Sequence, residues 1–191
     1  MKRAIIIHCW SDYPEYCWYP YAKRELEKQG FEVIVPAMPD TDEPMLSKWL
    51  PKLREVAGSV NENTYLIGHS AGCITIMRFL ELLPDNQRVG GVIFVAGFTD
   101  DLGFAELKNF FVVPLNFEKI KSKAKSFIAI ASDDDPYVPF DRKDILKERL
   151  GAEIIIKHGV KHFSGAADGD AACTELSEVV EAVLRIDNKK P

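Results

Sequence analysis

YLIGHSAG, residues 65–72, is the stretch of this sequence that decides its expected fold. The apolar run at 64–68 predicts a buried strand, and residues 73–83, apolar on most faces, predict a buried helix. Between them lies the pattern Gly-x-Ser-x-Gly with Ser70 at its centre. A turn this tight between strand and helix needs glycine at 68 and 72. It holds Ser70 in a strained conformation with an exposed hydroxyl.

On both sides of this turn, short apolar runs alternate with helical patterns. Strands are expected at residues 3–8, 31–36, 64–68, 91–96, 127–131 and 153–157. Helices are expected at 20–29, 46–57, 73–83, 141–150 and 176–184, with a kink or two helical pieces at Pro51. This alternation predicts an α/β fold: a parallel sheet with helices on both faces and right-handed crossovers. The long connection 97–125 is expected to carry a small helical insertion over the site, and residues 188–191 are expected to fray.

Length and charge limit the function classes. The chain has 191 residues, a net charge of -5 and 47% hydrophobic residues, which predicts one globular domain, residues 1–191. A mildly acidic chain without a basic stripe is not expected to bind nucleic acid. The apolar runs at 90–98 and 127–131 are about half as long as a membrane span requires. The run at 4–7 is too short for a signal peptide. We therefore expect a cytoplasmic protein with no nucleic-acid or membrane partner.

The cysteines point to no metal or redox site. Cys9, Cys17, Cys73 and Cys173 lack the CxxC spacing of such sites. A chain of this length needs no disulfides, so free thiols in a reducing compartment are expected. Because no Walker A, GxGxxG or HExxH motif occurs, we expect no metal and no cofactor.

A serine hydroxyl becomes a nucleophile when a base takes its proton, and histidine is the candidate base. His162 lies in the loop after the sixth expected strand, at the sheet edge where ligands bind, and we favour it. His69 lies inside the turn and is expected to point away from Ser70. His158 is expected to be a packed or surface residue. His8, at the end of the first strand, stands where a residue of the first loop would line the site.

The base needs an acid that holds its tautomer and stabilises its charged form. Three consecutive acids follow the fifth expected strand, in the stretch SDDDPYVP at 132–139. We favour Asp135 because the proline after it biases this residue toward an extended conformation. Asp133 and Asp134 are expected to serve the turn. The competing acids are Asp100 and Asp101, beyond the fourth strand. The order serine, acid, histidine is the one expected of an α/β hydrolase.

An oxyanion needs two backbone N–H donors. The first candidate is Ala71, at the N-terminus of the helix after Ser70. The second is expected from the loop HCWSDY at 8–13, where Trp10 is the first choice and Cys9 the second. Trp10 is also the one side chain that we assign to substrate binding. The other aromatic residues here either wall an apolar pocket or pack in the core: Tyr13, Tyr16, Trp18, Tyr19 and Tyr21.

These motifs together resemble the small single-domain α/β hydrolases that include the retinoblastoma-binding serine hydrolase of animals and its compact bacterial relatives. Besides GHSAG, the resemblance rests on PAMPD (36–40), WLP (49–51), DLG (101–103), EKIK (118–121), the acid loop 132–139 and HF (162–163). It spans nearly the whole chain. It implies six parallel strands in the order 2-1-3-4-5-6, no large lid, and a triad of Ser70, Asp135 and His162.

The activity implied by this resemblance is that of a carboxylesterase-like serine hydrolase, which cleaves small esters, or amides, through an acyl-enzyme on Ser70. Cys9 replaces a glycine that bacterial relatives tend to have. The Leu-x-Cys-x-Glu partner motif of the animal protein is absent, so retinoblastoma binding is not expected. The alternative is a non-catalytic or weakly catalytic binding module that keeps the fold. Fluorophosphonate labelling discriminates the two.

Overall fold

Six strands form one parallel sheet in the computed structural model, which describes residues 1–165 and 173–188. Their order is β2-β1-β3-β4-β5-β6, and each neighbouring pair is parallel. The strands are β1 (Lys2–Ile7), β2 (Phe31–Ile34), β3 (Thr64–His69), β4 (Gly91–Val95), β5 (Phe127–Ser132) and β6 (Glu153–Lys157). This confirms the strand order that the family resemblance implies.

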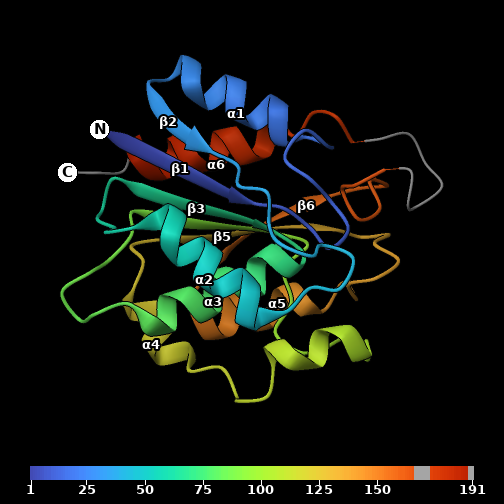
Figure 1. Ribbon diagram of the computed structural model, residues 1–191. Helices are drawn as coiled ribbons and strands as arrows, with labels where there is room; N and C mark the ends of the chain where they lie inside the picture. Colours follow the sequence, from blue (N-terminus) through green and yellow to red (C-terminus); the bar gives the residue numbers. More distant parts are fainter. Residues whose placement is uncertain (166–172, 189–191) are drawn as a thin grey trace.

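Helices cover both faces of the sheet, as the alternating pattern predicts. In the described residues they are α1 (Tyr19–Lys28), α2 (Leu46–Ala57), α3 (Ala71–Leu82), the 3-10 helix η1 (Ala105–Phe110), α4 (Phe117–Ser122), α5 (Arg142–Leu150) and α6 (Ser177–Asn188). Figure 1 shows α1 and α6 on one face, and α2 to α5 on the other. Of the segment expected to fray, Asn188 ends α6, and residues 189–191 lie outside the described residues.

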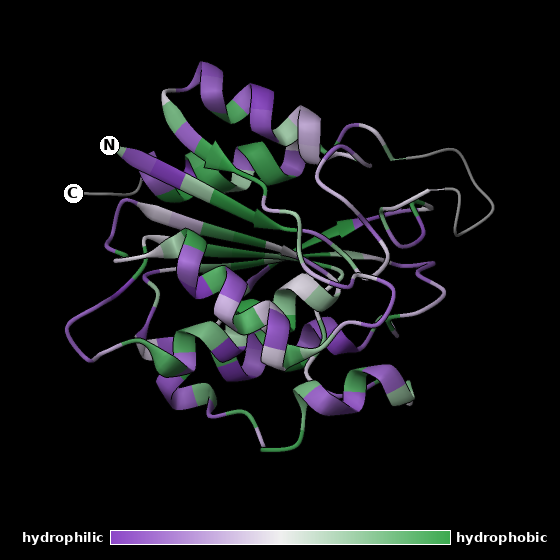
Figure 2. Ribbon diagram, viewed as in Figure 1, coloured by the Kyte–Doolittle hydropathy of each residue, from purple (hydrophilic) through white to green (hydrophobic). Residues whose placement is uncertain are grey.

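Continuous apolar runs place the core at the centre of this sheet. Every residue of β3 and β4 is buried, as a parallel strand covered on both faces requires. In Figure 2 the central strands are hydrophobic, whereas the outer helices carry hydrophilic residues as well. Helix α3 contacts β3 and β1 on one side and α2, α4 and η1 on the other, so its residues 71–80 are all buried.

Pro51 does not divide α2 into two pieces. The helix is unbroken from Leu46 to Ala57 with Pro51 inside it. The proline deprives the carbonyl of Ser47 of its helical partner, but both residues are exposed, so water can take its place. On the opposite side, Trp49 and Leu53 are fully buried and hold the helix against the core. Packing of the inward face therefore outweighs the local preference to break.

The connection between β4 and β5 carries the helical insertion that its weak periodicity suggested. It contains η1 and α4. The guanidinium Nε of Arg78, on α3, donates to the carbonyl of Phe110 at 2.9 Å. Asn109 accepts from the N–H of Leu46 at 2.7 Å, at the start of α2. These contacts fix η1 against α3 and the start of α2.

The structure also bears on membrane-spanning helices and on disulfides. Within residues 1–165 and 173–188 no helix has the length and apolar character that crossing a membrane requires. All four cysteines are free thiols, as expected.

Candidate active site

Ser70 occupies the strained turn that the sequence predicts. It has φ 51° and ψ -114° and lies between the end of β3 and the start of α3. A side chain at Gly68 would come within 2.7 Å of the Cα of Cys73, and one at Gly72 within 2.2 Å of the carbonyl oxygen of Ile7. Both glycines are therefore required by close backbone approach, and the hydroxyl of Ser70 does not cap the helix.

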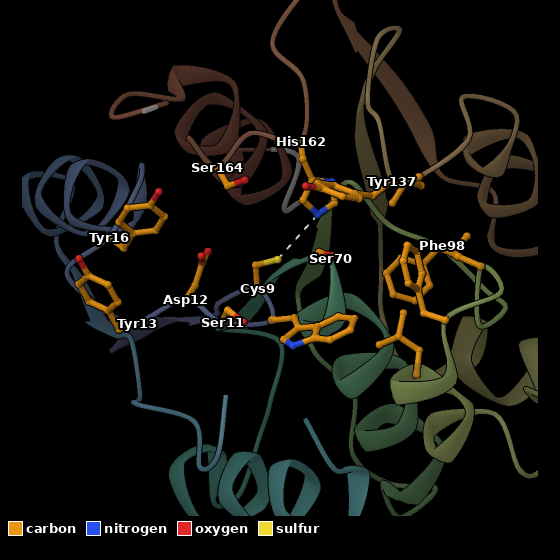
Figure 3. A pocket seen from close by; sticks show the side chains of 15 residues that line it. Cys9, Ser11, Asp12, Tyr13, Tyr16, Ser70, Phe98, Tyr137, His162 and Ser164 are labelled. Atoms are coloured by element: carbon orange, nitrogen blue, oxygen red, sulfur yellow. Dashed lines mark hydrogen bonds between the residues drawn. The ribbon is translucent and has the colours of Figure 1, made fainter. Parts of the chain in front are cut away.

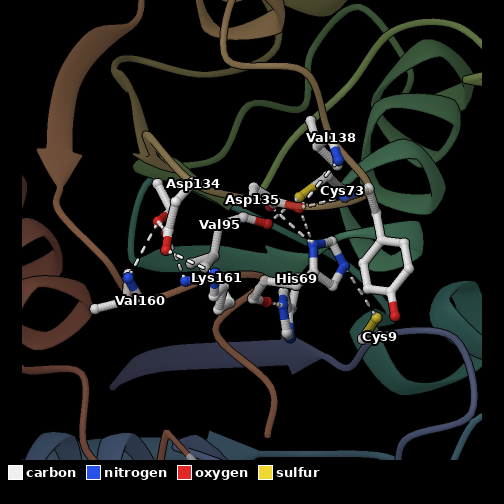
Figure 4. Close-up of polar contacts among 12 residues, drawn as sticks. Cys9, His69, Cys73, Val95, Asp134, Asp135, Val138, Val160 and Lys161 are labelled. Atoms are coloured by element: carbon white, nitrogen blue, oxygen red, sulfur yellow. Dashed lines mark hydrogen bonds and ion pairs between the residues drawn. The ribbon is translucent and has the colours of Figure 1, made fainter. Parts of the chain in front are cut away.

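His162 and Asp135 form a hydrogen-bonded pair at the same edge of the sheet. Nδ1 of His162 lies 2.8 Å and 3.0 Å from the two carboxylate oxygens of Asp135. The Oδ1 atom of Asp135 also accepts the N–H groups of Tyr137 at 2.9 Å and Val138 at 3.0 Å. Both side chains are nearly inaccessible to solvent. Asp135, which Figure 4 shows beside Val138, holds the ring of His162 in one orientation through these two contacts.

The other two acids of the loop bind the backbone that carries His162. Asp133 contacts Nδ1 of His158 at 2.6 Å and accepts the N–H of Gly159 at 3.1 Å. Asp134 accepts the N–H of Lys161 at 2.9 Å. These contacts hold the loop after β6 beside the loop after β5. A contact within their own turn, the role expected of both acids, is made by Asp134, which accepts the hydroxyl of Ser132 at 2.7 Å. The side chain of His158 is 80% exposed, as expected of a surface residue.

The competing acids beyond β4 are engaged in other contacts. Asp100 accepts the N–H of Leu102 at 2.9 Å and pairs with Nε of Arg142 at 2.9 Å. Asp101 accepts the N–H of Gly103 at 2.9 Å. In the described residues, Asp135 is thus the acid that contacts His162.

The surroundings of His162 favour its charged form. Burial alone would lower the pKa of His162, but the hydrogen bond to Asp135 and the contact with Cys9 outweigh it and raise the pKa to about 10. For His69 the result is opposite. Burial, together with the neighbouring charge of His162, holds the pKa of His69 well below its usual range. At neutral pH His162 is therefore the charged member of this pair and His69 the neutral one.

Nε2 of His162 contacts a sulfur atom. Its neighbour at 3.7 Å is Sγ of Cys9, in the loop after β1 (Figure 3). The hydrogen bond expected between this nitrogen and the Ser70 hydroxyl does not occur among the described residues. Ser70 nevertheless lines the same cavity as Cys9 and His162. All three side chains are buried, so Ser70 faces this cavity and not the open surface that the expected exposed hydroxyl would imply.

His69 and Tyr19 support the loops that carry Cys9 and His162. The Nε2–H of His69 donates to the carbonyl of His162 at 2.7 Å, and Nδ1 contacts the Tyr19 hydroxyl at 2.6 Å. That hydroxyl also contacts Asp12 and accepts the N–H of Cys9 at 3.0 Å. The Cys9 N–H is therefore occupied, and it is not available as the second oxyanion donor.

His8 holds the first loop and does not line the cavity. Its Nε2 accepts the N–H of Met38 at 3.0 Å, so Nδ1–H donates to the carbonyl of Cys9 at 2.8 Å. Trp10, in the same loop, does line the cavity, and its indole N–H donates to the carbonyl of Asp42 at 3.0 Å. Trp10 thus remains the candidate from this loop for the oxyanion donor, together with Ala71.

The cavity over Ser70 has a volume of about 310 Å³ and a mainly apolar wall. Its apolar and aromatic members are Trp10, Tyr13, Tyr16, Phe98, Leu102, Phe104, Leu107, Tyr137 and Val138. The aromatic cluster of the first loop is therefore divided: Tyr13 and Tyr16 line the cavity, whereas Trp18 and Tyr19 are fully buried in the core. Sequence reasoning assigned only Trp10 and missed the wall from the insertion and the acid loop.

The chain resembles known hydrolases over most of its length. Residues 4–176 match the family model described as serine hydrolase. YdeN of Bacillus subtilis (strain 168) is 35% identical over 164 residues, which cover 85% of this chain and 86% of YdeN. Serine hydrolase RBBP9 of Rattus norvegicus is 31% identical over 186 residues, 95% of this chain and 93% of the rat protein.

Solved structures show the same fold. The crystal structure of the ydeN gene product from B. subtilis matches with a TM-score of 0.92 at 32% identity, covering 99% of this chain and 100% of that one. Est1E from Butyrivibrio proteoclasticus, solved with ferulic acid bound, has a TM-score of 0.76 at 15% identity and covers 99% of this chain and 90% of its own.

Proposed function

The chain belongs to the serine hydrolase family, and on that premise we propose that it cleaves small carboxylic esters through an acyl-enzyme formed on Ser70. The observation that carries this proposal is that the strained Ser70 and His162, which is paired with Asp135, line the same mainly apolar cavity. We propose that residues 1–191 act as one hydrolase domain. The four free thiols support a reducing, cytoplasmic location as part of the same proposal.

In the proposed mechanism, the hydroxyl oxygen of Ser70 attacks the ester carbonyl while Nε2 of His162 takes its proton. Asp135 stabilises the imidazolium, which then protonates the departing alcohol. The N–H groups of Ala71 and Trp10 are proposed to hold the oxyanion, with support from the positive end of the α3 dipole. Water, activated by the same histidine, releases the acid and restores Ser70.

The contact between His162 and Cys9 fits this mechanism as a resting arrangement. Catalytic hydrogen bonds are often long or poorly aligned without substrate and tighten when it binds. Nε2 of His162 would leave Sγ of Cys9 for the Ser70 hydroxyl as the acyl group fills the cavity. Since the cavity is at the small end of ligand sites and its wall is mainly apolar, we propose a small apolar or aromatic acyl group.

A fluorophosphonate probe and a panel of p-nitrophenyl esters and aminoacyl amides test this proposal. The probe should label wild-type protein and Ser11→Ala, whose serine is exposed at the rim of the same cavity, but not Ser70→Ala. Ester hydrolysis should exceed amide hydrolysis. Absence of labelling and of turnover in wild-type protein would instead support the non-catalytic binding module.

The rate of hydrolysis is expected to rise with pH. Only neutral His162 accepts a proton, and its raised pKa, about 10, means that most molecules carry the charged form at neutral pH. kcat/KM reports the ionisation of the free enzyme, so it should increase between about pH 6 and pH 10, above the usual range of histidine near pH 6.5. In Cys9→Ser this increase of kcat/KM should occur at lower pH, because Cys9 contributes to the raised pKa of His162. A profile that is flat over this range, measured with a chelator present, would contradict a histidine base.

Trp10→Ala is expected to discriminate between substrates. The ring of Trp10 lies edge-on to Phe104, with 6.1 Å between ring centroids, in the cavity wall. Its removal should lower kcat/KM for a phenylacetyl ester by at least about tenfold and for an acetyl ester by much less. The backbone N–H stays in place, so the proposed oxyanion donor is retained. Tyr21 does not line the cavity, so Tyr21→Ala should change kcat/KM by the same factor for both esters. If Trp10→Ala lowered kcat/KM equally for the two esters, the ring of Trp10 would have no role in binding the acyl group.

A further inference from the structure

The thiol of Cys9 is a buried group, of a type that binds metal ions, at the site, and the proposed mechanism does not use it. Cys9, His69 and His162 bring one sulfur and two ring nitrogens within 4.8 Å of one another. Both ring nitrogens of His69 are already engaged, with Tyr19 and with the carbonyl of His162. Within the described residues of this group, the two atoms that remain available to bind a metal ion are therefore Sγ of Cys9 and Nε2 of His162. Both side chains line the cavity (Figure 3).

The separation of these two atoms matches that of two ligands on one tetrahedral metal ion. With Zn–S of about 2.3 Å, Zn–N of about 2.0 Å and a tetrahedral angle, the ligand atoms lie about 3.5 Å apart. Sγ of Cys9 and Nε2 of His162 are 3.7 Å apart. The two side chains therefore need almost no rearrangement to share an ion.

The environment of His162 adds a second feature of metal sites. A ligating histidine usually donates its other ring N–H to a carboxylate, which fixes the ring and raises its basicity. Nδ1 of His162 makes this contact with Asp135 at 2.8 Å. The remaining coordination positions open into the cavity, where water can fill them.

We propose that Cys9 and His162 bind a thiophilic divalent metal ion, of which Zn²⁺ is the type case, and that this ion inhibits hydrolysis. The inhibition rests on the proposed function, because the ion takes the Nε2 lone pair that would accept the proton of Ser70. Thiolate and imidazole ligands select Zn²⁺, Cd²⁺ and Co²⁺ over the oxygen-seeking Mg²⁺ and Ca²⁺. Binding releases the thiol proton of Cys9 and any imidazolium proton of His162 to solvent.

Spectroscopy tests binding without any need for activity. Titration of the wild-type protein with Co²⁺ should produce a thiolate-to-metal charge-transfer band, and an excess of Zn²⁺ should remove it. The band should be absent in Cys9→Ser and present in Cys173→Ser, whose thiol donates to the carbonyl of Glu175. Persistence of the band in Cys9→Ser, or its absence in wild-type protein, would overturn the proposal even if the enzyme proves active.

Kinetics tests the consequence of binding. Zn²⁺ should inhibit hydrolysis of p-nitrophenyl acetate, Mg²⁺ should not, and a chelator should restore the rate. Loss of a group that only hydrogen-bonds to a metal ligand lowers metal affinity by about 10–100-fold. Loss of the ligand Cys9 itself should cost more. Half inhibition of Cys9→Ser, relative to its own rate without metal, should therefore need at least about 100-fold more Zn²⁺ than half inhibition of the wild type. Equal sensitivity of Cys9→Ser and wild type would reject this site.

A third measurement needs only wild-type protein, and so stands even if Cys9→Ser fails to fold. Zn²⁺, but not Mg²⁺, should protect Cys9 from alkylation by iodoacetamide, as mass spectrometry of its peptide can determine. The Cys173 peptide of the same sample provides the internal control. Alkylation of Cys9 at the same rate with and without Zn²⁺ would contradict coordination by this thiol.

Discussion

Ser70→Ala is expected to abolish ester hydrolysis, with kcat lowered by about 10⁶, and to leave the fold intact. The change removes one oxygen atom that does not cap α3. The N–H of residue 70 still donates to the carbonyl of Val95, which is 2.9 Å away in the present structure. Steady-state kinetics and a thermal unfolding curve together separate loss of the nucleophile from loss of structure.

Cys9 offers a competing outcome for this prediction. Its sulfur, not the Ser70 hydroxyl, is the atom that contacts Nε2 of His162, so its thiol competes with Ser70 for the role of nucleophile. If Cys9 were the true nucleophile, Ser70→Ala would keep more than about a tenth of the rate, and Cys9→Ser would lose it. The matched pair of variants therefore decides between the two side chains.

Much of the fold could be predicted because the signals are local and repeated. Parallel strands buried on both faces, such as β3 and β4, must be continuous apolar runs, and such runs are visible in the sequence. Pro51 marks the limit of this reasoning. A local rule favoured a kink or break there, but the buried side chains of Trp49 and Leu53 keep α2 in one piece.

The candidate site was predictable to the extent that it lies at strand ends. Ser70, Asp135 and His162 follow three different strands of the parallel sheet, and their meeting follows from the topology. The contact between Cys9 and His162 joins two loops 153 residues apart, and no sequence period encodes its geometry. The wall that Phe98, Leu102 and Leu107 contribute comes from a connection without clear periodicity.

Asp135→Asn is expected to lower kcat by about 10⁴, the precedent for this change in a Ser-His-Asp triad. The structure explains why the new amide cannot rotate to compensate. Oδ1 of Asp135 accepts the N–H groups of Tyr137 and Val138, so the amide oxygen of an asparagine must stay there. Its NH₂ group then replaces Oδ2, the carboxylate oxygen nearer to Nδ1 of His162, at 2.8 Å. Oδ1 lies 3.0 Å from the same nitrogen but is shared with the two backbone N–H groups, so the NH₂ group displaces the stronger contact.

An amide donor at this position forces the proton of neutral His162 onto Nε2, the atom that must accept the proton of Ser70. Asp133→Asn is the matched control: it makes the same chemical change two positions earlier, on a carboxylate that contacts the exposed His158. It should cost less than about tenfold, or about 1.4 kcal/mol. Steady-state kinetics on both variants, with Asp100→Asn and Asp134→Asn beside them, tests the assignment. A greater loss for either of the last two than for Asp135→Asn would transfer the role of the acid to that residue while leaving Ser70 and His162 in place.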